Sequence, residues 1–181
     1  DECAFRYDEA CSAGVPVLSP QDFAPKTEGN PADAPAYRMI VDALFGIGLD
    51  SPGEGIRMAA TGKINRLRAK HPKACRVMAL DLPSGVSADS GKILGTAVHA
   101  DITVTFGQLK RGLLLYPTKL LIGELLTADI GIGFRGVGFY PEEWAVEEED
   151  VRRAMRRDPY SNKGTYGRVV LFAGSRGMSG A

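Results

Sequence analysis

Hydrophobic residues gather in four short runs that alternate with longer polar stretches. The first two, 37–45 (YRMIVDALF) and 76–82 (RVMALDL), are almost continuously apolar, as strands are when both faces of a parallel sheet are covered. The other two are 100–106 (ADITVTF) and 123–130 (GELLTADI). Each run has the length of a strand, so the pattern predicts that all four belong to a sheet.

Helical patterns connect and precede these runs. A helix is predicted over 52–70, and its apolar positions at helical spacing are Ile56, Ala60, Ile64 and Leu67. A further helix is predicted over 2–13 and closed by Gly14. Strands that are joined through helices or long crossovers run parallel, with right-handed connections. The expected fold class is therefore α/β, with a doubly wound, mostly parallel sheet.

The C-terminal part of the chain has a different pattern. A charged segment at 141–157 predicts a helix, and residues 168–173 predict a fifth strand before a glycine-rich loop. A polar helix followed by a new strand indicates a linker into another domain. The expected division is a first domain over 1–140, a linker helix over 141–158 and the beginning of a second domain over 159–181.

Composition and charge limit the partners of the protein. Of 181 residues, 44% are hydrophobic and 24% charged, a balance that lets a globular protein bury a core. Basic and acidic residues number 22 each, so a net charge of zero gives no reason to expect nucleic acid. No apolar run approaches the roughly 20 residues of a membrane span, so no membrane partner is expected. Self-association into a homo-oligomer stays open.

The cysteines indicate a reducing compartment. Cys3, Cys11 and Cys75 include no closely spaced pair, and on one helix the first two would lie roughly 12 Å apart, too far for a disulfide bond. We therefore expect reduced thiols in a cytoplasmic protein. The chain also opens without methionine, inside a predicted helix, and stops just after the glycine-rich loop. Both ends are expected to be cut, which leaves targeting signals open.

Two predicted strands carry an acid near their carboxyl ends, Asp42 in IVDALFGIG and Asp81 in ALDLPSG. Ligands of open α/β sheets bind beyond these ends. A buried carboxylate is costly unless it is paired, hydrogen-bonded or bound to a cation, and N–H groups of the next loop are the purely structural alternative. Ser84 adds a hydroxyl group in the turn after Asp81. Such hard oxygens suit a cation of the oxygen-binding class better than zinc.

The glycine turn at 46–52 suggests a second kind of contact. Gly46 and Gly48 allow an anion to approach the backbone at the start of the following helix, where free N–H groups favour phosphate. The third glycine of a dinucleotide fingerprint is replaced by Ser51, so the motif alone is weak. Lys110 follows the third strand and either reaches the same crevice or remains solvated.

Five segments follow one another along the chain: VDALFGIGL, ALDLPSGVSADSG, ADITVTFGQLKRGLLLYP, GELLTADIGI and NKGTYGRVVLFAGSRGMSGA. In this order they resemble the bifunctional NAD(P)H-hydrate repair enzymes. The resemblance implies a Rossmann-like epimerase domain that interconverts the R and S forms of hydrated NADH or NADPH. It also implies a ribokinase-like dehydratase domain that uses ADP or ATP to return the S form to NAD(P)H, of which only the beginning is present.

The resemblance assigns roles to single residues. Asp42 and Ser84 match positions that help to hold a potassium ion, and Asp81 matches an acid that contacts the hydrated nucleotide. Asp81, as acid or base at the carbinol carbon, and Lys110 are the candidates for catalysis. Ala181 matches the start of the hydrate site in the dehydratase domain. The other expected substrate contacts are Gly46, Ile47, Gly48, Leu49, Asp50, Ser51 and Pro52.

Two other interpretations stay open. One is a ribokinase-like small-molecule kinase with an N-terminal Rossmann-like regulatory domain. The other is a non-catalytic Rossmann-like domain that binds a nucleotide or a protein partner. The family's Asn-Asn-Gly-Gly-Asp-Gly loop, which supplies substrate contacts and a cation ligand, is expected to precede residue 1. The epimerase interpretation requires Asp42, Ser84 and Asp81 to meet at the carboxyl edge of the sheet.

Overall fold

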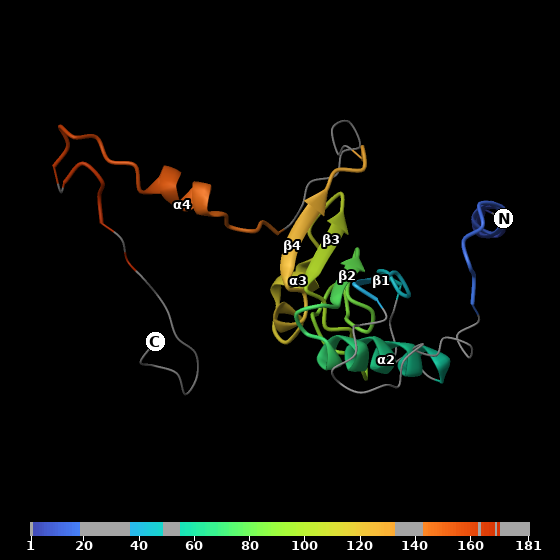
Figure 1. Cartoon of the computed structure of the whole chain (residues 1–181). Helices are drawn as coiled ribbons and strands as arrows, with labels where there is room; N and C mark the ends of the chain where they lie inside the picture. The colour runs from blue at the N-terminus through green and yellow to red at the C-terminus, as the bar shows by residue number, and fades with distance from the viewer. Residues whose placement is uncertain are drawn as a thin grey trace. The chain divides into compact units, whose positions relative to one another are not determined.

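The computed structural model in Figure 1 describes residues 2–18, 37–48, 55–132, 143–162, 164–168 and 170. The chain divides into two compact units, Asp1–Gly133 and Phe134–Ala181. The elements of the first unit are α1 (Glu2–Ser12), β1 (Met39–Asp42), α2 (Ile56–Lys70), β2 (Arg76–Leu80), β3 (Ile102–Phe106), α3 (Arg111–Leu114), the 3-10 helix η1 (Thr118–Leu120) and β4 (Glu124–Ala128). In the second unit the described residues include α4 (Glu148–Ala154).

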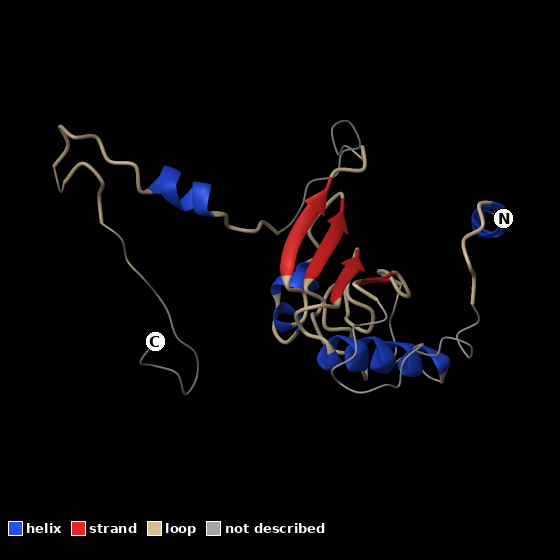
Figure 2. Cartoon of the chain, in the orientation of Figure 1, coloured by secondary structure: helices blue, strands red, loops and turns tan. Residues whose placement is uncertain are grey.

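The strands of the described residues form one parallel sheet in the order β1-β2-β3-β4 (Figure 2). This confirms the predicted α/β class. Each strand lies inside its predicted run but is shorter than the run. For β2 the reason is visible in the backbone, because Asp81 has a φ of 67° and this left-handed conformation ends the extended segment at Leu80.

Two apolar clusters fill the core on the α2 side of the sheet. Ile64 of α2 packs with Val77 of β2 and with Val98, and Ile40 of β1 lies against them. Val77 is completely buried, which stabilises the fold by about 1.5–3 kcal/mol. The second cluster joins the loops after the strands to the chain around α3 and η1, and its buried members are Leu82, Val86, Ala97, Leu113, Leu121 and Ile122.

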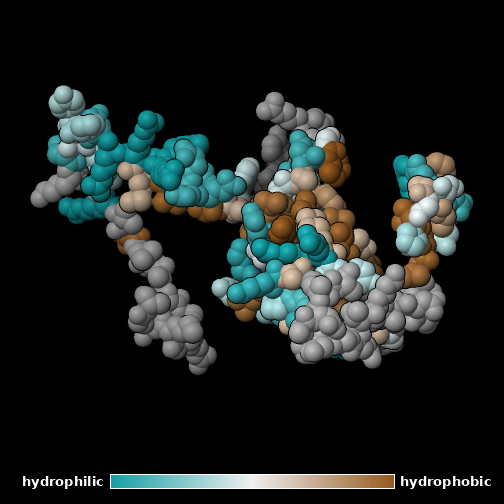
Figure 3. All heavy atoms as spheres, viewed as in Figure 1, coloured by the Kyte–Doolittle hydropathy of each residue, from teal (hydrophilic) through white to brown (hydrophobic). Residues whose placement is uncertain are grey.

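The other face of the sheet carries apolar side chains that are partly open to solvent. Successive strand residues point to opposite faces, so Met39 and Val41 lie on the face away from buried Asp42. These two side chains are 50% and 52% exposed, and Leu126 of β4 is 46% exposed. Figure 3 shows patches of apolar surface over the strands of the first unit and mainly polar surface around α4. Among the described residues, the sheet is therefore well covered on one face only.

Helix boundaries differ from the predicted ones. α2 ends at Lys70 as predicted, but Gly55 precedes its first residue, Ile56, and the predicted start at Pro52 lies outside the described residues. None of the helices described is long and apolar enough to cross a membrane.

The predicted helix over 141–157 is confirmed at Glu148–Ala154, the extent of α4, but is wrong at 143–147 and 155–157, while residues 141–142 lie outside the described residues. The helix begins there because Glu147 has an extended backbone and its N–H donates to the carboxylate of Asp150 at 3.0 Å. The predicted strand over 168–173 lies outside the described residues except at 168 and 170. The boundaries proposed for the linker helix and the second domain therefore stay predictions.

Candidate functional site

Four of the residues predicted to form the site lie at or just after the carboxyl ends of the strands. β1 ends at Asp42, Asp81 and Ser84 follow the end of β2, and Lys110 follows the end of β3. Asp42 stands opposite Ala79 in the parallel pairing of β1 with β2, so both strands end at nearly the same level. This edge is where open α/β sheets bind ligands.

Asp42 and Ser84 form a buried pair at this edge. Their exposed fractions are 0% and 1%. The Ser84 hydroxyl donates to Oδ1 of Asp42 at 2.6 Å, and the Ser84 N–H donates to Oδ2 at 2.8 Å. The Leu44 N–H approaches Oδ1 at 3.4 Å, and the Phe45 N–H donates to the Ser84 hydroxyl at 3.1 Å. These bonds satisfy the buried carboxylate and tie the loop after β1 to the loop after β2.

The chemistry of this pair suits a hard cation. An ionised carboxylate can accept about four hydrogen bonds or metal contacts, so Asp42 retains lone pairs beyond the three N–H and O–H donors that it meets. Oxygen donors of this kind bind potassium-like or calcium-like ions rather than zinc. Within the described ranges, no group of three or more His, Cys, Asp or Glu side chains is placed to hold a metal ion. A cation at this edge would therefore need oxygen ligands in addition to those of the pair.

The glycine turn begins beside this pair, because Phe45 is bonded to Ser84. Gly46 and Gly48 are open, since a methyl group built on either one would meet no atom within 4 Å. Ile47 between them is 65% exposed. The other expected substrate contacts lie outside the described residues and are Leu49, Asp50, Ser51, Pro52 and Ala181.

Asp81 is the centre of a second network. Its Oδ1 accepts hydrogen bonds from Lys110 Nζ at 2.5 Å, from the Thr105 hydroxyl at 3.3 Å and from the Phe106 N–H at 3.3 Å. Lys110 also donates to the Phe106 carbonyl at 2.8 Å and to the Thr105 hydroxyl at 3.1 Å. The side chains of Asp81 and Lys110 are each 19% exposed. The ion pair is thus largely sheltered but still reachable from solvent.

The backbone around Asp81 is constrained. Asp81 is the only non-glycine residue with a positive φ among those described, and its N–H donates to the Val104 carbonyl at 2.7 Å. Three residues further on, Ser84 donates to Asp42, while the Ser84 carbonyl accepts from the Val98 N–H at 2.8 Å. A left-handed aspartate at a ligand-binding edge is typical of a functional turn that its surroundings hold in place.

Thr105 is the site residue that sequence reasoning missed. A threonine in a strand is common and attracts no attention by itself. One signal was available: in ADITVTF, Thr103 and Thr105 alternate with apolar residues and face the same side of the strand. Both are fully buried, and a buried hydroxyl requires a partner. Thr103 finds it in the Ile122 carbonyl, whereas Thr105 finds it in Asp81.

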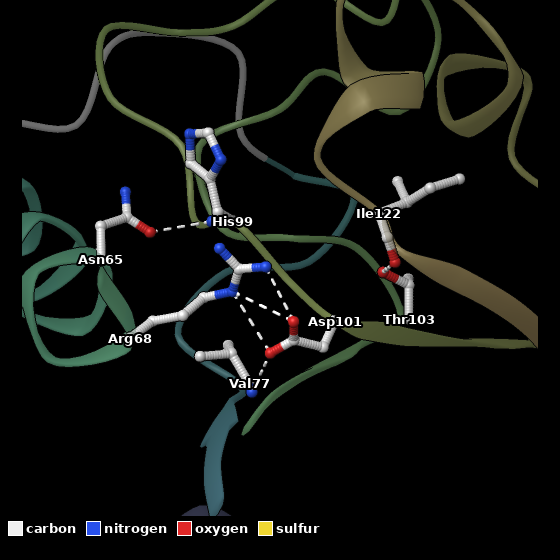
Figure 4. Close-up of polar contacts among 7 residues, drawn as sticks. All are labelled: Asn65, Arg68, Val77, His99, Asp101, Thr103 and Ile122. Carbon is white, nitrogen blue, oxygen red and sulfur yellow. Dashed lines mark hydrogen bonds and ion pairs between the residues drawn. The ribbon is translucent and has the colours of Figure 1, made fainter. Parts of the chain in front are cut away.

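A third network lies at the opposite, amino edge of the sheet (Figure 4). The Arg68 guanidinium of α2 points at Asp101 and donates to its carboxylate at 2.7 Å, and the Val77 N–H donates to the same carboxylate at 2.8 Å. Burial by itself raises the pKa of Asp101. The hydrogen bonds and the charges of Arg68, the Val77 N–H and the charge of Arg76 outweigh that effect, so the pKa of Asp101 lies below its ordinary value of 3.8.

Asn65, one turn before Arg68, adds two hydrogen bonds between α2 and the loop before β3. Its side-chain amide donates to the Ala97 carbonyl at 2.8 Å and accepts from the His99 N–H at 2.9 Å. The imidazole of His99 takes no part in the bond, and His99 is exposed. These contacts connect α2 to the loop before β3 and contribute to stability rather than to the site.

Comparison with known proteins agrees with the motifs quoted above. The family model described as "YjeF-related protein N-terminus" matches residues 1–112. A bifunctional NAD(P)H-hydrate repair enzyme of Thermofilum pendens is 36% identical over 97% of this chain and 32% of its own length. An NAD(P)H-hydrate epimerase of Limosilactobacillus fermentum is 40% identical over 50% of the chain and 41% of its own length. The Escherichia coli repair enzyme is 33% identical over 79% of the chain and 27% of its own length.

The chain thus spans about a third of the length of the Thermofilum pendens relative. The family match covers the whole of β1, α2, β2 and β3 and includes Asp42, Asp81, Ser84 and Lys110. On these grounds the chain belongs to the family of YjeF-related N-terminal domains, the family of the NAD(P)H-hydrate repair enzymes that its motifs predict.

Proposed function

We propose that this chain carries most of an NAD(P)H-hydrate epimerase site, and that the full-length protein couples this epimerase to a dehydratase. The observation that carries the proposal is the reachable carboxylate of Asp81, bonded to Lys110 at the carboxyl edge of the sheet and three residues from the Asp42–Ser84 pair. The names of the relatives, an NAD(P)H-hydrate repair enzyme and an NAD(P)H-hydrate epimerase, support the reaction and the class of substrate. The two forms to be interconverted are the R and S hydrates of NADH or NADPH that the resemblance implies.

Epimerisation inverts the carbon that carries the added hydroxyl group, next to the ring nitrogen. A carboxylate within hydrogen-bond reach of a substrate proton can act as a general base, and the Asp81 side chain is partly exposed. In the proposed step Asp81 takes the hydroxyl proton while the bond from that carbon to the ring nitrogen breaks, which leaves an aldehyde, and the nitrogen receives the proton. Ring closure on the opposite face reverses each transfer. No atom is gained or lost, as an isomerisation requires.

The neighbouring residues take supporting roles in this proposal. Asp42 and Ser84 contribute oxygen ligands to a potassium ion, which adds positive charge near an anionic nucleotide. The backbone of the glycine turn, residues 46–52, binds the phosphate-bearing part of the substrate, while Asp81 contacts the hydrated ring. Ala181 belongs to the hydrate site of the dehydratase domain, where ADP or ATP is used. Cys11 and Cys75 are free thiols, which supports a cytoplasmic location.

The two other interpretations gain no support from these relatives, which are named repair enzymes or an epimerase. A kinase would use ATP to phosphorylate a small molecule. A binding domain would retain affinity for the nucleotide without turnover.

The test uses the full-length protein and the purified R hydrate of NADPH, with an excess of a separate dehydratase specific for the S hydrate. Regeneration of NADPH then reports the rate of epimerisation. We expect strong acceleration in potassium buffer, and a loss of about a hundredfold or more in Asp81→Asn. Asp89→Asn is the matched control, because Asp89 is an exposed aspartate in the loop beyond this site. No acceleration by the wild-type protein in the presence of potassium contradicts the proposal.

A further inference from the structure

The ammonium group of Lys110 has no donor left for a ligand. A lysine can donate three hydrogen bonds. Lys110 Nζ has three acceptors within reach: Asp81 Oδ1 at 2.5 Å, the Phe106 carbonyl at 2.8 Å and the Thr105 hydroxyl at 3.1 Å. Its side chain is also largely sheltered, at 19% exposure. Lys110 is therefore committed to the protein, which distinguishes it from a lysine that binds substrate.

The two oxygens of Asp81 are not equivalent. Oδ1 accepts from Lys110, from the Thr105 hydroxyl and from the Phe106 N–H. Oδ2 accepts no hydrogen bond from any of the described residues. The carboxylate is thus held through one oxygen, while the other is left for a further partner, and the side chain is partly exposed.

Thr105 links the two charged groups in a fixed direction. Its hydroxyl accepts from Lys110 Nζ and donates to Asp81 Oδ1, which uses its proton and one lone pair. Thr105 is fully buried on β3, so the hydroxyl has little freedom to find another partner. Lys110 is also anchored through its backbone, since its carbonyl accepts from the Leu113 N–H at 3.0 Å in the turn of α3.

We propose that Thr105 and Lys110 are positioning residues that hold Oδ1 of Asp81, so that Oδ2 is the oxygen that exchanges the proton with the substrate. This inference rests on the proposed epimerase function, and it replaces the sequence-based expectation of direct catalysis by Lys110. The three groups come from the end of β3, the loop after β3 and the turn after β2. A fixed carboxylate meets the substrate in one orientation, which is the usual contribution of a supporting contact to catalysis.

The kinetic test compares Thr105→Val, Thr105→Ser, Lys110→Met and Lys110→Arg in the full-length protein. Thr105→Val removes the hydroxyl at nearly constant volume, and we expect kcat for the R hydrate to fall about tenfold with little change in KM. Lys110→Met removes a charged partner, and we expect a fall of about a hundredfold. Thr105→Ser keeps the hydroxyl and should restore most of kcat.

Thr103→Val is the matched control. Thr103 is equally buried on the same strand, but its hydroxyl donates to the Ile122 carbonyl at 2.7 Å and does not contact Asp81. We expect Thr103→Val to lower stability as much as Thr105→Val while kcat stays within about twofold. Equal kcat losses in the two valine variants, or unchanged kcat in Thr105→Val and Lys110→Met, would overturn the proposal.

A structural measurement separates this proposal from the proposed function. Crystal structures of Thr105→Val and Lys110→Met should show the Asp81 carboxylate rotated or in several conformers, with a single conformer in the wild type and in Thr103→Val. An unchanged Asp81 in both variants overturns the positioning role, whether or not the protein is an epimerase. If the wild type fails to epimerise the hydrate but Asp81 moves as expected, the proposed function is wrong and the positioning role stands.

Discussion

The Ser84 hydroxyl donates a 2.6 Å hydrogen bond to Oδ1 of Asp42, although the two residues come from different strand ends and are separated by 42 positions in the chain. Both are buried, and the Ser84 N–H bonds the second oxygen of the same carboxylate. The contact joins the loop that leads to the glycine turn with the loop that carries Asp81. A change at Ser84 is therefore expected to affect both loops.

Ser84→Ala should remove the response to potassium. If Ser84 and Asp42 hold the ion, potassium chloride raises the melting temperature of the wild-type full-length protein, by about 5 °C when the site is saturated. Choline chloride at equal concentration corrects for ionic strength. Ser84→Ala lacks one ligand and loses the hydroxyl that accepts from the Phe45 N–H, so the rise should disappear.

Ser90→Ala provides the control for this experiment, because Ser90 is exposed and the partners of its hydroxyl lie in its own loop: it donates to the Ser87 hydroxyl at 2.9 Å and accepts from the Lys92 N–H at 3.4 Å. Its potassium response should equal that of the wild type. A potassium response that survives in Ser84→Ala shows that the ion, if it binds, does so elsewhere.

Asp101→Asn should destabilise the protein at neutral pH but hardly at acid pH. The pKa of Asp101 is lowered in the folded state, so the carboxylate stabilises the fold above its unfolded pKa, and this stabilisation is lost as the pH falls through the lower folded value. We expect a loss of about 2 kcal/mol near pH 7. The difference from wild type should shrink once the pH is below 3.8. Urea unfolding at a series of pH values measures it, and a difference that is constant with pH contradicts the assignment.

Cys75 should be protected from thiol reagents in the folded protein. Burial raises the pKa of its thiol, and the negative charge of Asp101 raises it further, so little thiolate forms. In a variant that keeps Cys75 alone (Cys3→Ser and Cys11→Ser), we expect a coloured disulfide reagent to react only as denaturant unfolds the chain. A variant that keeps exposed Cys11 alone should react at once. Equal rates in native buffer would show that Cys75 is not enclosed.

Gly85→Ala should damage the turn that carries Ser84. Gly85 has a φ of 99°, and a methyl group there would collide with the Thr96 carbonyl and the Ala97 backbone. Because backbone cannot move aside cheaply, we expect destabilisation of about 3 kcal/mol or more. Gly131→Ala is the control: its φ is also positive, at 76°, but its surroundings are open, so the cost should be about 1 kcal/mol. Chemical denaturation compares the two, and equal losses would rule out the steric explanation.

Most of the sheet could be predicted because its strands are buried and therefore apolar. The runs that contain β1 and β2 stand out against polar neighbours, and their parallel pairing follows from the helix between them. The strand ends were less predictable, since they depend on backbone geometry such as the left-handed conformation of Asp81. The helix predicted over 141–157 was too long because a charged segment can be solvated in several conformations, and the contact between Glu147 and Asp150 defines where α4 begins.

The parts of the candidate site that the sequence could predict are the charged residues in otherwise apolar strands. Asp42 and Asp81 were conspicuous because acids are rare at buried strand ends. Thr105 was not, since its importance depends on a hydrogen bond to a residue 24 positions away. The three donors of Lys110 and their acceptors are likewise a property of three-dimensional packing, and no spacing along the chain reveals them.

The Arg68–Asp101 contact and Asp81 lie at opposite ends of β2 and β3. Val77, which bonds Asp101, and Asp81 are separated along the chain by roughly 13 Å, at about 3.3 Å per residue. Engineering for heat resistance can therefore change one end of the sheet while leaving the candidate site at the other end unaltered. Conversely, substitutions at the candidate site would leave the Arg68–Asp101 contact between α2 and the sheet intact. Residues at the carboxyl edge can therefore vary while this contact continues to stabilise the fold.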